Sequence, residues 1–441
     1  MAVPVLHIAF FIARLVSKKA RLRHTGVQKT WHILAELPRP LANAKRFWFH
    51  AASMGEFEQV KPIIELIKSH APDSQIIVSF FSPSGYEHQK NYPLADAVVY
   101  LPLASQCAAR CFIDAVQPSC AVFARYDLWY NILMALKDRS IPSVLVCATL
   151  NENNPLLRFG AGREYLRRVY NSLATIYTAG ASETAKFGHL DITASVATSA
   201  DTRFDRIAEQ VTLAQAEGTQ AFGLSEDFFR EDDVVLVLGS SWKPDEDCIL
   251  EAMKHLEHPL QERLRLIIAP HEPTEETVIR LREILPQSEY LSVLEERLGS
   301  AVAVQQSPPQ QTNPQHIIVD SIGKLLRLYA LADAAYIGGG FGAGVHSVTE
   351  PAGYGIPLAS GANIGRARDA IALHDKGALT VFRSVEDAYE WLSMILQSPN
   401  ICKQQGSIAH EYIHSGLGWS EYIAKTVILV TKDSSTYFDV A

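Results

Sequence analysis

The pattern that most constrains this fold is an alternation of short apolar runs with longer amphipathic segments. It begins near residue 45 and starts again near residue 234. Short apolar runs between helical segments are typical of parallel strands that helices cover on both faces. The alternation therefore predicts an α/β fold with two doubly wound, Rossmann-like domains, each carrying its ligands beyond the carboxyl ends of its strands.

A single hydrophobic core seldom serves a chain of 441 residues, so the length agrees with two domains. Residues 212–231 are polar and weakly periodic, which predicts a linker. We expect five parts, which are an N-terminal segment at 1–30, a first domain at 31–211, the linker at 212–231, a second domain at 232–405 and a C-terminal helical segment at 406–441.

The net charge of −8 argues against nucleic acid as a partner. The six cysteines include no Cys-x-x-Cys pair, and nothing near Cys107 and Cys111 supplies the other ligands of a zinc site. We interpret all six as reduced thiols, mostly buried.

Residues 1–16 are mostly apolar and are followed by Lys18, Lys19, Arg21 and Arg23. This run is shorter than the ~20 residues that span a bilayer, and its charges follow the apolar part rather than precede it as in a signal peptide. The order favours a helix that lies in the membrane face with its basic residues on anionic headgroups. The alternative is a first helix packed on the protein's own core.

The loop at 50–56 directly follows the first predicted strand and reads His-Ala-Ala-Ser-Met-Gly-Glu. Ser53 and Glu56 have the Ser-x-x-Glu spacing of a capping box. In the catalytic interpretation, Glu56 is a general base at the end of the strand and Gly55 leaves room for a substrate. Spacing alone leaves both interpretations open.

The loop at 239–247 combines hydroxyls with acids. Ser240, Ser241 and Lys243 are placed to hold a phosphate. The acidic run 245–247 has the Asp-x-Asp form of some metal sites, but acids in a first helical turn also complement the helix macrodipole. We favour the macrodipole and predict no required metal.

Two further loops follow predicted strands of the second series. Pro270 and His271 end one of them, and His271 is either a surface residue or a ligand contact. Asp320 either caps the next helix or, with Gly323 and the helix start, receives a nucleotide.

The segment 338–351 reads strand end, glycine loop, then helix start. Glycines allow positive φ and close approach of a ligand to the backbone, and Gly339 lies at the centre of this run. Ser347 and Glu350 match a capping box, but Pro351 fits that arrangement poorly. The segment thus predicts a site for a nucleotide joined to a sugar, with Glu350 on sugar hydroxyls.

Taken together, these loops resemble the 3-deoxy-D-manno-octulosonic acid (Kdo) transferases of lipopolysaccharide synthesis, in their Bacteroidetes-like branch. The resemblance runs along nearly the whole chain. It rests on the apolar–basic N-terminus and on segments 50–56, 123–129, 201–206, 239–242, 269–271, 320–325 and 338–351.

The resemblance implies a GT-B glycosyltransferase that moves Kdo from CMP-Kdo to a lipid A precursor (lipid IVA), with inversion at the sugar. The first domain would bind the acceptor and the second the CMP-sugar. The implied partners are the lipid acceptor and the cytoplasmic face of the bacterial inner membrane, and no cofactor beyond the donor substrate is implied. The oligomeric state stays open.

The resemblance also implies roles by position. Glu56 would deprotonate the acceptor hydroxyl, with Ser53, Gly55 and Arg203 on the acceptor side. The donor would lie among Ser240, Ser241, Pro270, His271, Asp320, Gly323, Gly339, Ser347 and Glu350. A basic stretch formed by Arg158, Arg163, Arg167 and Arg168 would either meet acceptor phosphates or be a solvated helix face.

The chain departs from the family pattern at several positions. Ser347 replaces an asparagine, Ala200 a glycine and Asp127 a glutamate, and no arginine follows the strand near 150. Two alternatives therefore stay open, namely a GT-B transferase for another nucleotide sugar and a membrane-bound nucleotide-sugar binder without turnover.

Overall fold

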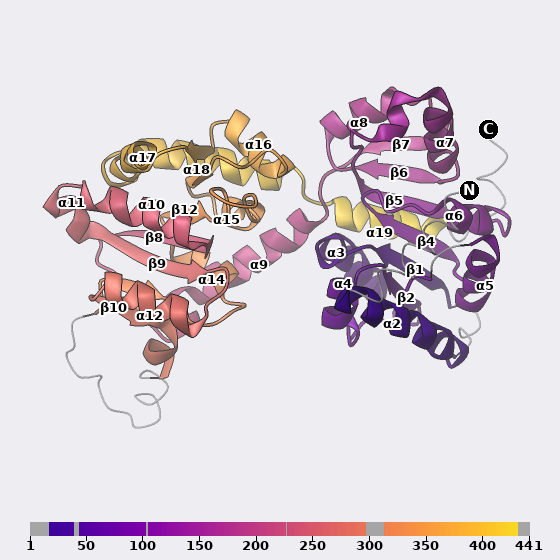
Figure 1. Cartoon of the computed structure of the whole chain (residues 1–441), viewed down its shortest axis with the longest axis horizontal. Coiled ribbons are helices and arrows are strands. Elements are labelled where there is room, and N and C mark those ends of the chain that lie inside the picture. Colours follow the sequence, from indigo (N-terminus) through magenta and orange to yellow (C-terminus); the bar gives the residue numbers. More distant parts are fainter. Residues whose placement is uncertain (1–16, 39–43, 103–104, 226, 297–312, 431–441) are drawn as a thin grey trace. The chain divides into compact units, whose positions relative to one another are not determined.

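The computed structural model describes residues 17–38, 44–102, 105–225, 227–296 and 313–430 (Figure 1). The chain folds as two compact units. The first runs to Asp205 and includes the residues from Gly416 onward, and the second runs from Arg206 to Ser415.

The first unit is built on a seven-stranded sheet whose strands are all parallel. The strand order is β3-β2-β1-β4-β5-β6-β7, so the order of winding reverses between β1 and β4. The strands are β1 (Arg46–Ala51), β2 (Gln75–Phe80), β3 (Ala97–Tyr100), β4 (Cys120–Ala124), β5 (Ser143–Ala148), β6 (Thr175–Thr178) and β7 (Ser195–Thr198).

Helices cover both faces of this sheet (Figure 1), and a separate apolar cluster lies on each face. The strands β1, β2, β4 and β5 are buried along their whole length. The helices are α2 (Lys18–Ala35), α3 (Met54–His70), α4 (Pro83–Gln89), α5 (Gln106–Val116), α6 (Tyr130–Lys137), α7 (Gly160–Tyr170), α8 (Ala181–Gly188) and α19 (Trp419–Val430), with the 3-10 turn η1 (Pro155–Arg158).

The second unit repeats the plan with a parallel sheet in the order β10-β11-β9-β8-β12-β13-β14, which reverses between β8 and β12. Its strands are β8 (Val234–Ser241), β9 (Leu264–Pro270), β10 (Ser288–Tyr290), β11 (His316–Ile318), β12 (Ala334–Ile337), β13 (Leu358–Gly361) and β14 (Leu379–Phe382). Its helices are α10 (Lys243–Lys254), α11 (His258–Arg263), α12 (Glu275–Ile284), α14 (Leu325–Leu328), α15 (Thr349–Gly353), α16 (Arg368–Asp375), α17 (Val385–Gln397) and α18 (Pro399–His414), with 3-10 turns η2 (Gly218–Phe222) and η3 (Tyr329–Leu331).

The predicted α/β architecture is confirmed, and the two strand series begin at Arg46 and Val234, close to the predicted residues 45 and 234. Strands β7 and β13 have weak apolar patterns. Strand β7 consists of small residues and is half exposed, and β13 reads Leu-Ala-Ser-Gly. Ser82, which follows β2, caps the start of α4 by accepting a hydrogen bond from the Ser84 N–H.

The predicted linker at 212–231 differs from what the structure shows. Helix α9 (Arg203–Glu217) carries the chain from one unit to the other, and η2 follows it directly. Buried apolar residues recur along α9 at helical spacing, namely Phe204, Ile207, Val211 and Ala214. This stripe is the buried face of a helix, so residues 212–222 of the predicted linker are helical rather than an irregular spacer.

The C-terminal segment also divides differently from the predicted range. Helix α18 stays with the second unit, whereas α19, yellow in Figure 1, returns to the first and packs on α3. Asp205 accepts hydrogen bonds from the backbone N–H groups of Gly418 and Ser420, at 2.6 and 2.9 Å, and so caps the start of α19. The buried face of α19 completes an apolar cluster of the first unit.

The basic residues of α2 correct part of the prediction for the segment 1–30. The Arg23 side chain is buried and donates to the carbonyl oxygens of Phe81 (3.1 Å) and Leu101 (2.8 Å), which follow β2 and β3. Gly26 lies against the ring of Tyr100. Residues 18–35 thus belong to the first unit's fold, and residues 1–16 lie outside the described residues. Among the described helices, none combines the length and apolar character needed to cross a membrane.

His316 provides a test of the second unit's packing. Its side chain is buried at the start of β11, and its Nδ1 accepts a hydrogen bond from the Leu266 N–H (3.1 Å). Burial, and then the nearby charge of Arg265, lower the pKa of His316 to about 4. We expect the second unit to lose stability as the pH falls from 6.5 toward 4, because the unfolded chain binds a proton that the folded chain excludes.

The difference between a pKa of 6.5 and one of about 4 corresponds to ~3 kcal/mol. Denaturant unfolding at pH 7 and pH 4.5 measures it. In His316→Asn the loss on acidification should shrink, while the exposed His255→Asn should behave as wild type. An equal loss in both variants would assign the acid sensitivity to other groups.

Candidate active site

Glu56 lies at the switch point of the first sheet, in the first turn of α3 directly after β1. Its side chain is only 4% exposed, and Oε2 accepts a hydrogen bond from the Ala52 N–H at 2.6 Å. The predicted capping box is incomplete, because the Ser53 side chain accepts no capping hydrogen bond. The Glu56 side chain therefore points back past the N-cap residue Ser53 toward the end of β1. A Cβ added at Gly55 would meet nothing within 4 Å, so space is open beside it.

The surroundings of Glu56 suit a base that binds its proton more tightly than an ordinary carboxylate. Burial raises the pKa of Glu56, the hydrogen bond from Ala52 opposes this, and the charge of Asp127 raises it further. His50 and Arg125 act in the opposite direction. A general base works best when its pKa approaches the working pH, so the net shift favours proton transfer.

A buried hydrogen-bonded chain lies beside Glu56. Trp48 Nε1–H donates to Ser79 Oγ (2.8 Å), Ser79 Oγ lies 2.8 Å from His50 Nδ1, and His50 Nε2 lies 2.9 Å from Asp127 Oδ2. Because Ser79 Oγ already accepts from the indole, its own hydrogen is free to point at Nδ1. The imidazole then carries its proton on Nε2 and donates it to Asp127.

Asp127 remains ionised beside this imidazole. Burial alone would raise its pKa, but the hydrogen bond from His50 and the charge of Arg23 bring the pKa of Asp127 below its ordinary value. The Asp127 carboxylate therefore holds a negative charge close to Glu56. Asp127 follows β4, which pairs with β1, and Glu56 follows β1. Arg125, in the same loop, has the left-handed φ of 59° and a buried Nε with no hydrogen-bond partner among the described residues.

Arg203, expected on the acceptor side, forms an ion pair with the buried Asp201 at 2.9 Å. Asp201 also accepts from Gln59 Nε2 (2.7 Å), and the Thr202 hydroxyl donates to the Gln59 carbonyl. The element 201–206 thus ties the start of α9 to α3. These hydrogen bonds hold α3 in place, and α3 carries Glu56.

In the second unit, the glycine loop 338–344 follows β12 at the switch point. Gly339 has φ 91° and Gly344 φ 134°, which L side chains rarely adopt. A Cβ at Gly338 would lie 2.3 Å from the Ser240 carbonyl oxygen, and one at Gly340 2.5 Å from the backbone of Gly361. The packing of neighbouring strand ends therefore requires these two glycines.

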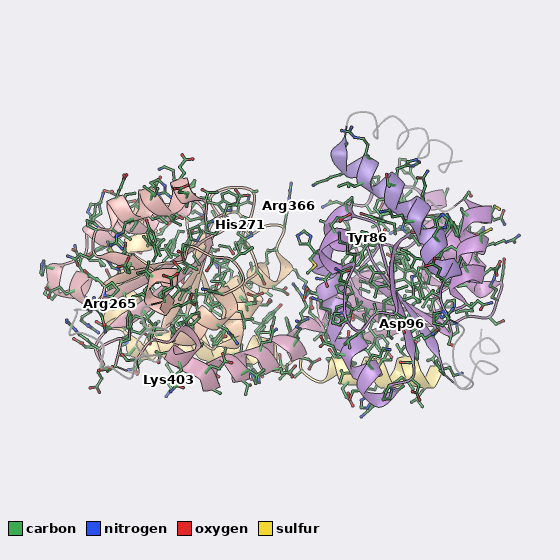
Figure 2. The ribbon with its side chains drawn as sticks, turned by 90° about the horizontal axis from the view of Figure 1, so that it is seen from below. Tyr86, Asp96, Arg265, His271, Arg366 and Lys403 are labelled. Atoms are coloured by element: carbon green, nitrogen blue, oxygen red, sulfur yellow. The ribbon has the colours of Figure 1, made fainter. Side chains whose placement is uncertain are left out.

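Three rings form a stack beside this loop. The Trp242 and His271 rings lie 4.8 Å apart, the His271 and His346 rings lie 4.3 Å apart at 15°, and Trp242 Nε1–H donates to His346 Nε2 at 3.1 Å. Burial, then His271, lower the pKa of His346. His271 is labelled in Figure 2. Neither Trp242 nor His346 was among the predicted site residues, although both neighbour predicted ones in the sequence.

The hydroxyls predicted to hold phosphate occupy different environments. Ser241 is buried, and its Oγ donates to Glu246 (2.8 Å), which also pairs with Arg280. Ser240 is partly exposed in the left-handed region, with φ 51°. Strained backbone of this kind concentrates at functional sites, and here it presents Ser240 at the end of β8.

Asp245 lies in the first turn of α10 and caps the start of that helix. Its carboxylate accepts from the Trp242 N–H (2.9 Å), the Gly339 N–H (2.9 Å) and the Tyr336 hydroxyl (2.8 Å). It is therefore a structural acid that joins α10 to the glycine loop. Among the described residues, no group of three or more His, Cys, Asp or Glu side chains is arranged to hold a metal ion.

Glu350 lies half-buried in the first turn of α15, near Tyr329 and Tyr354, whose pKa values its charge helps to raise after burial. The capping box with Ser347 is absent, since Ser347 Oγ pairs with Thr349 Oγ1 at 3.1 Å. The helix begins one residue later than that box requires. Pro351 is thus its third residue, where no helical hydrogen bond is lost.

The remaining predicted donor residues lie at neighbouring strand ends. Pro270 ends β9, and the next backbone N–H, that of His271, donates to the Ser241 carbonyl (2.9 Å). Asp320 accepts from the Ser292 N–H (3.2 Å), so it does not cap the helix that follows it. Gly323 has φ 85°. Helix α14 has only four residues, which leaves little macrodipole for an anion there.

The loop after β13 also reaches this site. No apolar run in the sequence predicted β13. Asn363 exchanges backbone hydrogen bonds with Gly340 (2.8 Å) and Val345 (3.1 Å), and its side chain donates to the Gly342 carbonyl (2.8 Å). Arg366 projects from the same loop and is exposed (Figure 2). This loop thus carries an exposed cation that the sequence interpretation missed.

Residues 18–206 match the family model of 3-deoxy-D-manno-octulosonic-acid transferase (Kdo transferase). The match covers residues 18–206 of the 441-residue chain, so this part of the chain is similar to Kdo transferases. The chain is 22% identical to the Kdo transferase of Haemophilus influenzae, over 93% of this chain and 92% of that one. It is 25% identical to that of Chlamydophila psittaci, over 73% of this chain and 70% of that one.

Solved structures support the fold. UDP-GlcNAc 2-epimerase from Neisseria meningitidis, bound to UDP-GlcNAc, matches with a TM-score of 0.58 at 14% identity, covering 87% of this chain and 99% of that one. MurG from Acinetobacter baumannii matches with a TM-score of 0.52 at 12% identity, covering 87% and 99%. The predicted GT-B class of two Rossmann-like domains is confirmed, as is the resemblance to Kdo transferases.

Gly340, which packs against backbone, and Gly342, which has room beside it, give a matched test. Gly340→Ala should destabilise the second unit and weaken CMP binding, because its Cβ meets the Gly361 backbone. Gly342→Ala should leave both nearly unchanged, since its Cβ meets only the Gly339 carbonyl oxygen, at 3.8 Å. Thermal unfolding and CMP titration measure these effects. If Gly342→Ala alone lost CMP binding, the ligand rather than the packing would require the loop glycines.

Proposed function

We propose that this protein is an inverting glycosyltransferase that transfers Kdo from CMP-Kdo to a lipid A precursor such as lipid IVA. The family match over residues 18–206, and relatives named Kdo transferases along nearly the whole chain, support Kdo transfer. The observation that carries the mechanism is the buried Glu56 at the end of β1, with its raised pKa.

In the proposed reaction, an acceptor hydroxyl attacks the anomeric carbon of Kdo while its proton passes to Glu56. The bond from that carbon to the CMP phosphate oxygen breaks, and CMP leaves. The ionised Asp127, 2.9 Å from His50, holds negative charge near Glu56 and so supports proton uptake there. Ser53, Gly55 and the Arg203–Asp201 pair belong to the acceptor-side unit.

On the donor side, we propose that CMP lies against the carboxyl ends of β8 and β12. The exposed Trp242 and the stacked histidines offer rings for the base, and Glu350 offers a carboxylate for the ribose. Ser240 and the exposed Arg366 are positioned in loops that supply charge and donors for the phosphate. Ser241, Asp245 and Asp320 support this site, since each is engaged within the protein.

Glu56→Gln should reduce transfer from CMP-Kdo to a tetra-acylated lipid A precursor by roughly 10²-fold or more, since positioned bases contribute ~10²–10⁴-fold. Glu58→Gln is the matched control on the same helix, because Glu58 is partly exposed and pairs with Lys61. Wild-type activity should fall as the pH drops through the raised pKa of Glu56, above 4.5, and this limb should vanish in Glu56→Gln. CMP release measures the rate.

Equal rates for Glu56→Gln and Glu58→Gln would remove Glu56 from the role of base. Activity with a UDP-sugar but not with CMP-Kdo would favour the other-donor alternative. CMP-Kdo binding without CMP release would favour a binder without turnover. We also propose that no metal is required, so the assay should run equally fast in EDTA, and a loss of rate there would refute that part.

We further propose that residues 1–16 attach the protein to the cytoplasmic face of the inner membrane. Because α2 packs on β3, a chain that begins at residue 17 should fold and bind CMP as before. It should move from the membrane to the soluble fraction in sedimentation of cell extracts. If the shortened chain stays with the membrane, another surface makes the attachment.

A further inference from the structure

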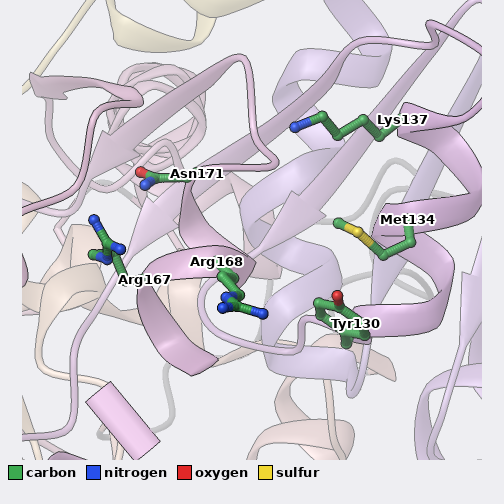
Figure 3. A pocket seen from close by; sticks show the side chains of 6 residues that line it. All are labelled: Tyr130, Met134, Lys137, Arg167, Arg168 and Asn171. Atoms are coloured by element: carbon green, nitrogen blue, oxygen red, sulfur yellow. The ribbon is translucent and has the colours of Figure 1, made fainter. Parts of the chain in front are cut away.

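A hollow of about 240 Å³ opens on the first unit beside α6 and α7 (Figure 3). It is lined by Tyr130, Met134, Lys137, Arg167, Arg168 and Asn171. In Figure 3, the three residues of α6 lie on one side of the opening, and the arginines and Asn171 lie on the other. None of these six residues belongs to the candidate active site.

The polar side chains around the hollow present hydrogen-bond donors. Asn171 Oδ1 accepts from the N–H groups of Thr193 (2.7 Å) and Ala194 (3.3 Å), which fixes the amide. Its NH₂ group is then left to donate, and it has no acceptor among the described residues. Lys137 carries three N–H donors, and Tyr130 carries a hydroxyl. A ligand that fits this lining must accept hydrogen bonds.

Glu164 holds both arginines in place. Its carboxylate accepts from Arg167 Nε (2.8 Å) and Arg168 Nε (2.7 Å). Each guanidinium has five N–H donors, so most of them remain available beyond this pairing. The carboxylate therefore orients the two cations without using up their capacity to bind an anion.

The charge balance is positive even after the helix ends are counted. Lys137, Arg167 and Arg168 give three positive charges and Glu164 one negative, a side-chain sum of +2. Cations in a last helical turn are the usual complement of the macrodipole, and the ends of α6 and α7 contribute about −0.5 each. A net charge of about +1 remains, so the dipoles alone do not account for the cations.

The geometry points to a site for a phosphate monoester, a dianion whose oxygens accept from Lys137, Asn171 and the two guanidinium groups. Guanidinium and phosphate match in geometry, since two parallel N–H groups meet two oxygens. The apolar Met134 side chain and the Tyr130 ring border the same opening and suit the organic part that bears the phosphate. This site stands independently of the proposed Kdo transfer.

The test uses the full-length protein and two probes, inorganic phosphate and vesicles of phosphatidylcholine with or without phosphatidic acid. Titration at constant ionic strength in chloride measures phosphate binding. Wild type should show saturable binding, and Lys137→Glu and Arg168→Glu should weaken it at least tenfold. Lys137→Arg should restore it, and Lys90→Glu, a charge reversal on α4 of the same unit, should bind as wild type.

The vesicle arm identifies the source of the phosphate. Binding to phosphatidic acid vesicles that millimolar phosphate displaces, and that Lys137→Glu loses, assigns the site to a lipid headgroup. Saturable phosphate binding without preference for those vesicles assigns it to a soluble ligand. No saturable binding in wild type, or an equal loss in Lys90→Glu, would overturn the proposal. Circular dichroism of each variant excludes misfolding as the cause.

Discussion

Burial of both faces of two parallel sheets is the constraint on which the rest of this structure depends. Helices and apolar clusters cover the sheet surfaces, so side chains pointing from the strands cannot meet a ligand. What remains is the carboxyl-end edge, where the winding order of each sheet reverses and two loops diverge. Glu56 and Asp127 flank that point in the first unit. The glycine loop and Trp242 flank it in the second.

The two units place an acid in the first turn after their first strand, but the two acids differ in their hydrogen bonds. Asp245 accepts from three donors, the N–H groups of Trp242 and Gly339 and the hydroxyl of Tyr336. Glu56 accepts one, from Ala52, and is buried near a second carboxylate. A carboxylate that accepts several hydrogen bonds is stabilised in its ionised form and holds elements together. A carboxylate that accepts few hydrogen bonds can take up a proton more readily. This contrast, rather than position alone, supports the proposal that Glu56 is the general base.

Long-range ties explain where the sequence interpretation differed from the structure. Arg203 was expected on the acceptor side, and the structure adds that side chains of its segment 201–206 join α3, α9 and α19. Helix α19 comes from the far end of the chain, so no local pattern indicates that Asp205 caps it. Arg23 was expected on lipid headgroups, yet it binds carbonyl oxygens that follow β2 and β3. Such partners lie tens or hundreds of residues away and appear only after folding.

The sequence alone determined the strand and helix alternation, the two-domain α/β class and the loops in which site residues lie, because apolar periodicity and glycine or proline placement act within a few residues. Only the tertiary structure decided the chemistry of individual groups. It packed Gly338 and Gly340 against neighbouring backbone, and it stacked His271 on His346. It also raised the pKa of Glu56 by burial. These properties depend on which atoms surround a group in space, and separate strand ends bring those atoms together.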